Sequence, residues 1–142
     1  MRIRTTSILG VFAVGVAGGV VLYASQFVGP AGPSPAAIQR MQLVRGLGSL
    51  AVLAGAGLAG YSLFDSHTVR RSYWSVLALF LLSGIVGYGA GFTALVVAPP
   101  SGFTVGSVAI TAGLVGFEEV LPFTLAGFSG ASVRALRHPA RD

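Results

Sequence analysis

The chain has 142 residues, of which 54% are hydrophobic and only 9% are charged. Soluble domains carry roughly 25% charged residues, so water cannot cover most of this surface, and the sequence predicts an all-α integral membrane protein. The absence of Cys excludes a disulfide framework, a Cys-ligated metal and a thiol nucleophile. The net charge of +5 comes from arginines dispersed beside apolar runs, which favours anionic lipid headgroups over nucleic acid as a partner.

Four apolar runs are long enough to cross a membrane, since about 20 helical residues span a hydrocarbon core of about 30 Å. In chain order they cover about 7–28, 43–64, 73–98 and 103–131. The connections between them, which are rich in residues that end helices, are 29–42, 65–72 and 99–102. We therefore expect a single transmembrane domain over 1–142, folded as a compact four-transmembrane-helix bundle.

The distribution of arginine predicts the orientation, because short loops rich in positive charge stay in the cytoplasm. With the N-terminus inside, only Arg40 and Arg45 of the nine basic residues fall in outside segments. Tyr73 and Trp74, which follow Arg71, are typical of an aromatic belt at the cytoplasmic interface. We expect a multi-pass protein of the cell membrane with both termini in the cytoplasm.

Small residues recur four positions apart in every apolar run. Gly15 and Gly19 in the first run and Gly87 and Gly91 in the third have this spacing. In lipid, helices associate by close backbone approach at such faces. The pattern favours packing of the chain on itself, and a glycine face left over would instead dock onto another subunit.

Glu118 and Glu119 lie within the fourth run, the only one that contains acids. Counted from Phe103 at the outer face, they lie about 22 to 24 Å along the helix, which is the inner half of the bilayer. An acid at the centre of a membrane helix costs at least about 2.5 kcal/mol, so such a residue is a functional candidate. Pro122 cannot donate a hydrogen bond to the Glu118 carbonyl and leaves that oxygen free beside the acids.

Folding neighbouring runs into antiparallel hairpins predicts what surrounds the two acids. Glu118 is then level with Ser83 and Gly84 of the third run and with small residues of the second and first. This layer leaves either unusually close helix packing or a small hydrated space, and the acids require the second. No arginine is level with them, because Arg45 falls near the outer face. The small neighbours that predict an inward orientation for Glu119 are Ala112, Gly116 and Ala126.

A rival interpretation ends the fourth span near Phe117. The acids would then lie at the membrane interface, and Val120 to Ala131 would form a second, shallow helix. This alternative remains open at the level of sequence, although a span from Phe103 to Phe117 is shorter than the usual minimum of about 17 residues.

Together these features favour a non-catalytic accessory or structural subunit that packs through glycine-rich helix faces. The alternative is a small proton- or cation-coupled transporter or channel in which Glu118 and Glu119 titrate or bind the ion. The hydroxyl groups that could assist them are those of Ser83, Tyr88 and Thr124.

An enzyme is not expected, because nothing in the chain supplies a nucleophile together with a base. His67 and His138 lack the spacing of metal ligands, so we expect no metal site and no cofactor. The expected partners are the lipid bilayer and either a larger membrane complex or a second copy of the chain.

Overall fold

The computed structural model describes residues 4–27, 34–99 and 104–137, and within these ranges it contains helices and no strand. In chain order the helices are α1 (Thr5–Ser25), α2 (Pro35–Leu63), α3 (Ser66–Val97) and α4 (Val105–Arg137). By length and composition, α1, α2 and α3 could each cross a membrane. The all-helical class predicted from the sequence is confirmed. Val28, where the first run is expected to end, and Phe103, where the fourth is expected to begin, lie outside the described residues. The arginines at positions 2 and 141 lie outside them as well.

α2 and α3 begin about two helical turns earlier than the apolar runs predict. α2 begins at Pro35, within the expected Pro-rich connection, because Ser34 caps it by accepting a hydrogen bond from the Ala37 N–H at 3.2 Å. Proline suits the first position of a helix, where its missing N–H is not needed. α3 begins at Ser66, so most of the expected polar turn is helical. A non-helical residue, Ser72 (φ −138°, ψ 37°), interrupts α3 just before the predicted start of the third run.

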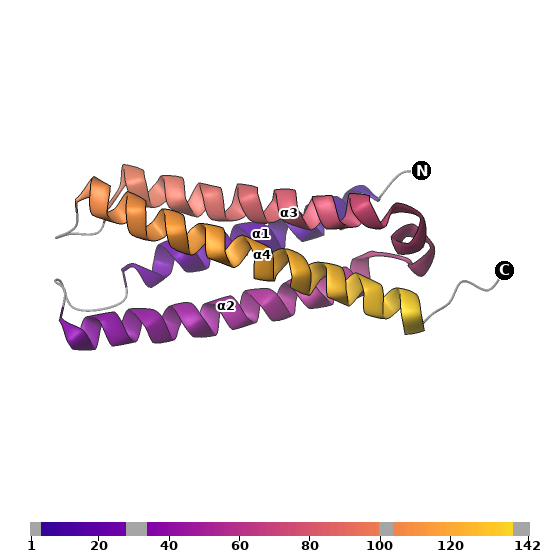
Figure 1. Cartoon of the computed structure of the whole chain (residues 1–142), viewed down its shortest axis with the longest axis horizontal. Coiled ribbons are helices and arrows are strands. Elements are labelled where there is room, and N and C mark those ends of the chain that lie inside the picture. Colours follow the sequence, from indigo (N-terminus) through magenta and orange to yellow (C-terminus); the bar gives the residue numbers. More distant parts are fainter. Residues whose placement is uncertain (1–3, 28–33, 100–103, 138–142) are drawn as a thin grey trace.

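The four helices lie side by side, and α1 begins at the same end of the molecule at which α4 ends (Figure 1). We call this end the termini end, and the opposite end, where α1 and α3 end and α2 and α4 begin, the loop end. α3 packs against α1 and α4, and α2 packs against α4 and α1, whereas α2 and α3 make no backbone contact. The expectation that α2 and α3 form a packed hairpin is therefore wrong. The pairs α1 with α3 and α2 with α4 run parallel, as the chain direction in Figure 1 shows.

α1 and α3 approach so closely that their backbones touch. A Cβ atom on Gly87 would collide with the carbonyl oxygen of Gly15, and a Cβ atom on Gly91 would collide with that of Gly19. Only a residue without a side chain fits at such positions. These are the four glycines whose spacing stood out in the sequence.

α2 and α4 meet in the same manner. A Cβ atom on Gly60 would collide with the carbonyl oxygen of Gly127, and a Cβ atom on Gly130 would collide with that of Gly57. The contact is reciprocal, since each helix places one glycine against the other's backbone. The first helical hairpin, α1 with α2, thus packs against the second, α3 with α4, through two parallel contacts between backbones.

A row of aromatic rings fills the space between these contacts. Phe64, Phe80 and Phe123 are fully buried. The ring centroids are 6.0 Å apart between Phe64 and Phe80 and 6.1 Å apart between Phe80 and Phe123, and Tyr88 lies 6.2 Å beyond Phe123. The edge-to-face contacts of the last two pairs are favourable ring geometries. The row leads from the α2–α3 connection toward the loop end and finishes at Tyr88.

Polar side chains close the termini end of α2. The Arg134 guanidinium donates to the Tyr61 carbonyl at 2.8 Å, and the Ser7 hydroxyl donates to the Leu63 carbonyl at 2.6 Å. Both carbonyls belong to the last turn of the helix, which has no intrahelical donors for them. A cation placed there also interacts favourably with the helix dipole.

Candidate functional site

Helix α4 continues without a break through Glu118, Glu119 and Pro122 to Arg137. The separate second helix of the rival interpretation, from Val120 to Ala131, is therefore wrong. The two acids point in different directions, because successive helical positions are about 100° apart. Glu118 is exposed, whereas the Glu119 side chain is 15% exposed and faces the other helices. Glu119 is thus the inward acid, as the small residues on its side predict.

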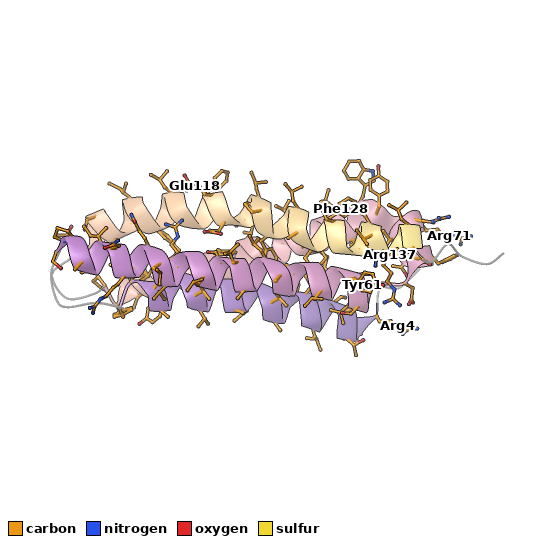
Figure 2. The ribbon with its side chains drawn as sticks, turned by 90° about the horizontal axis from the view of Figure 1, so that it is seen from below. Arg4, Tyr61, Arg71, Glu118, Phe128 and Arg137 are labelled. Carbon is orange, nitrogen blue, oxygen red and sulfur yellow. The ribbon has the colours of Figure 1, made fainter. Side chains whose placement is uncertain are left out.

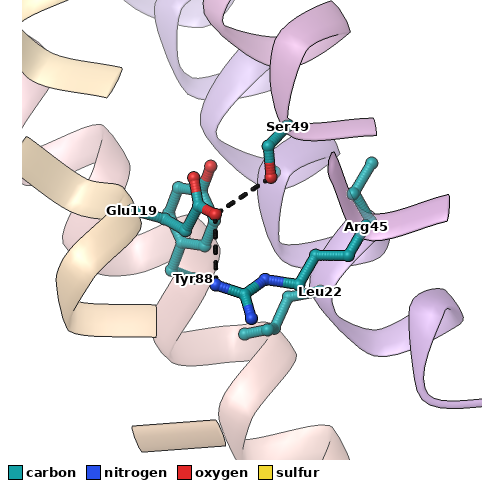
Figure 3. Close-up of a pocket in the computed structure, with 7 residues that line it drawn as sticks. Leu22, Arg45, Ser49, Tyr88 and Glu119 are labelled. Carbon is teal, nitrogen blue, oxygen red and sulfur yellow. Dashed lines mark hydrogen bonds and ion pairs between the residues drawn. The ribbon is translucent and has the colours of Figure 1, made fainter. Parts of the chain in front are cut away.

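Glu119 meets two polar residues of α2 (Figure 3). The Arg45 guanidinium lies 3.4 Å from its Oε1 atom, and the Ser49 hydroxyl donates to the same oxygen at 3.0 Å. Arg45 and Ser49 are one helical turn apart, so both project from one face of α2. The prediction that no arginine is level with the acids is wrong. It placed the acids level with the middle of the second run, whereas Gly57 in that part of α2 meets α4 beyond the acids, at Gly130.

The group also lies closer to the loop end than expected. Gly18 and Leu22 line the same space as Glu119, and α1 ends at Ser25. Leu22 also faces Gly116, one turn before Glu119. From this common level, α4 continues toward the loop end as far as Val105, whereas α1 ends at Ser25. At 1.5 Å per residue, α4 therefore extends beyond α1 by about 12 Å. Counting from the first residue of the fourth run therefore placed the acids too near the termini end.

Tyr88 is the one other predicted site residue that lies with Glu119. Its ring is buried on α3 and packs against Gly18 of α1, where a Cβ atom would lie 2.9 Å from the Tyr88 hydroxyl. The gap that these residues share with Arg45 is too narrow to admit a water molecule. Among the described residues, the small hydrated space expected around the acids is not present beside Glu119, where the helices pack closely.

Ser83 and Thr124 do not join this group. The buried Ser83 hydroxyl donates to the Val11 carbonyl of α1 at 2.8 Å, and the Thr124 hydroxyl donates to the Val120 carbonyl of its own helix at 2.8 Å. Each hydroxyl therefore donates its proton to a backbone carbonyl and not to an acid. Among the described residues, Glu119, Arg45, Ser49 and Tyr88 form the candidate site, and Glu118 lies outside it.

The geometry makes the ion pair a modest one. A charge-assisted N–H···O bond is normally about 2.7 to 2.9 Å long, so the separation of 3.4 Å between Arg45 and Glu119 is loose. The Arg45 side chain is 31% exposed and retains access to the outside of the helices. The hydrogen bond from Ser49 is the better formed of the two. Arg45 supplies the compensating charge, and Ser49 fixes the position of the carboxylate.

Sequence reasoning overlooked Arg45 and Ser49, although one signal was available. Arg45 is the single charged residue within the second apolar run, and Ser49 follows it by one helical turn. An arginine inside a membrane span requires an acid or a set of carbonyl groups nearby. The fourth run contains the only acids of the apolar runs, so the pairing could have been inferred from charge alone.

Comparison of the chain with protein-family models, with curated protein sequences and with solved structures found no match.

Proposed function

We propose that this chain is a small multi-pass protein of the cell membrane in which all four helices, packed as a bundle through glycine contacts, cross the bilayer. Three helices qualify by length and apolar composition. α4 has 33 residues and packs against α2 and α3, which supports a parallel course through the membrane. Its inward acid is compatible with that course because Arg45 compensates the charge of Glu119.

The orientation that we propose places the termini end in the cytoplasm. Arg4, Arg71 and Arg137 lie at this end, as Figure 2 shows. Positive charge next to membrane helices favours the cytoplasmic side and the anionic headgroups there. Tyr73 and Trp74 are exposed beside Arg71, with ring centroids 4.6 Å apart, and suit the headgroup region.

For the role of the protein we propose a non-catalytic accessory or structural subunit of a membrane complex. The observation that carries this proposal is the closed state of the candidate site. Glu119 is held by Arg45 and Ser49 in a gap that does not admit water. The backbone contacts between parallel helices hold the surrounding helices at fixed spacing. A closely packed interior of this kind favours a structural role over a transport pathway.

The alternative proposal is a small proton- or cation-coupled transporter. In its favour, an acid and an arginine lie between helices that could cross a membrane, and Arg45 remains partly exposed. Exchange of Arg45 for a proton or a cation at Glu119 would be the coupling step. This step requires α2 and α4 to separate at Ser49, and the reciprocal contact of Gly57 and Gly60 with α4 opposes that motion.

Purification at native abundance and a flux assay together test the proposal. The tagged chain is extracted from its own membranes in mild detergent, and its mass and that of any co-eluting protein are measured. The purified chain is then reconstituted into vesicles with a pH-sensitive dye inside. We expect a stoichiometric partner protein and no proton uptake above that of empty vesicles. Proton uptake that is lost in Glu119→Gln and kept in Glu118→Gln would instead establish the transporter.

A further inference from the structure

Glu118 occupies an outer face of α4 that none of the described helices covers. It points away from the packed helices (Figure 2), and its carboxylate makes no hydrogen bond or ion pair among the described residues. The large apolar side chains around it are exposed as well. With Glu118 they form what we call the Glu118 face: Ile110, Leu114, Phe117, Leu121 and Leu125, which are 56–76% exposed.

The spacing of this face is that of a helix-packing seam. Its apolar members follow one another at intervals of three and four residues, as in the seam of two helices that pack lengthwise. Ile110 lies about 12 Å from Glu118 toward the loop end, and Leu125 lies about 10 Å from it in the other direction. Glu118 is therefore surrounded by apolar surface on both sides along the helix axis.

A second acceptor stands beside the carboxylate. Pro122, one turn after Glu118 and also exposed, has no N–H to donate to the Glu118 carbonyl. One small area of apolar surface thus presents a carboxylate and a backbone carbonyl without its helical donor. In lipid, unsatisfied polar groups cost several kcal/mol each, so this area requires a donor group from outside the chain.

The charges at this level indicate which kind of donor fits. Arg45 is already paired with Glu119, so one negative charge, that of Glu118, remains without compensation. A second copy of the chain would bring the same excess of negative charge. A guanidinium or ammonium group of a different protein would compensate Glu118, and a guanidinium has enough donors for both the carboxylate and the carbonyl.

We infer that the Glu118 face is the docking surface for one membrane-spanning helix of another protein, and that this helix carries an arginine or lysine level with Glu118. The inference rests on the proposed role as an accessory subunit and specifies its partner. The partner helix packs its apolar side chains along Leu114, Phe117 and Leu121, while its cation binds Glu118.

Photo-crosslinking in native membranes tests this docking surface. A photoreactive amino acid is placed at Leu121 on the Glu118 face or, as the matched control, at Leu82 on α3, because these leucines are 56% and 55% exposed. We expect a crosslink from Leu121 to a membrane-spanning helix of another protein, at a position within one or two turns of an arginine or lysine. Glu118→Gln should reduce the crosslink yield about tenfold, as expected for the loss of one charge-assisted contact.

Two further variants separate docking from folding. Because Glu118 is exposed, Glu118→Gln should leave unfolding in detergent unchanged. Glu118→Arg should abolish the crosslink, and changing the partner's cation to Glu should restore it. A crosslink of twice the chain mass, equal yields from Leu121 and Leu82, or a partner helix without a cation would each overturn the inference. If a stoichiometric partner crosslinks from Leu82 alone, the accessory role stands and only this surface is wrong.

Discussion

Three glycines of α3 provide a matched test of the contact between α1 and α3. Replacing Gly87 or Gly91 by Ala places a methyl group against the backbone of α1, whereas the same change at Gly89 meets no atom within 4 Å. The three positions lie within little more than one turn of the same helix. Differences in helix propensity or in lipid depth therefore cannot explain a difference in stability among the three variants.

The magnitude follows from what the new methyl group would meet. A Cβ atom on Gly87 overlaps the Gly15 carbonyl and comes within 2.8 Å of the Val16 backbone nitrogen, whereas ordinary contact begins at 3.4 Å. Backbone atoms cannot rotate away, so the two helices must separate by on the order of 1 Å and lose dispersion contacts along the interface. Overpacking of this kind costs about 1 to 3 kcal/mol, and the gain from Gly→Ala in a helix is about 1 kcal/mol.

We therefore expect Gly87→Ala to lower the free energy of unfolding by about 1 to 2 kcal/mol. This value is the upper part of the range for overpacking, from which the gain in helix propensity has been subtracted. Gly89→Ala should show no loss. Reversible unfolding by SDS in mild detergent micelles, followed by circular dichroism, measures both values. Equal free energies of unfolding for the two variants would refute the argument that backbone contact holds α1 against α3.

The other predictions concern the ion pair, the second backbone contact and the topology. Breaking the pair by Arg45→Met should destabilise the protein by about 1 to 3 kcal/mol. The loss is smaller than for a fully buried pair because Arg45 is partly exposed. In a double-mutant cycle, adding Glu119→Gln to Arg45→Met should recover part of this loss. Additive effects in that cycle would show that the two charges do not interact. Gly60→Ala should weaken the contact of α2 with α4, whereas Gly46→Ala, which meets no atom within 4 Å, should not; the same SDS titration compares them. Since the chain has no Cys, single cysteines at Ser34 and Ser66 can be labelled in intact cells with an impermeant thiol reagent, and labelling at Ser66 but not at Ser34 would reverse the proposed orientation.

The sequence predicted which segments are helical better than it predicted which helices pack against each other. Apolar runs and glycine spacing are local properties, so the helical class and the inward direction of Glu119 could be inferred from them. Which helix lies beside which depends on the whole set of contacts. A hairpin is the default for a short connection such as Phe64–Asp65, and here the contacts of Gly60 and Gly127 between α2 and α4 override it.

The same error, together with the wrong level of the acids along the helix axis, explains why half of the candidate site was overlooked. With α2 placed against α3, Arg45 had no acid within reach, and Glu119 had no cation. With α2 placed against α4, both residues acquire a partner and Ser49 gains a role. The exposure of Glu118 could not be predicted either, because it depends on which side of α4 the two neighbouring helices occupy.

The pairing of α1 with α3 and of α2 with α4 has a consequence for biosynthesis. In the proposed membrane arrangement, the ribosome releases α1 and α2 before the glycines of the second hairpin exist, so Gly15 and Gly19 first enter the bilayer with no backbone to contact. The early hairpin must wait in lipid, with its polar Arg45 uncompensated, until Glu119 has been translated.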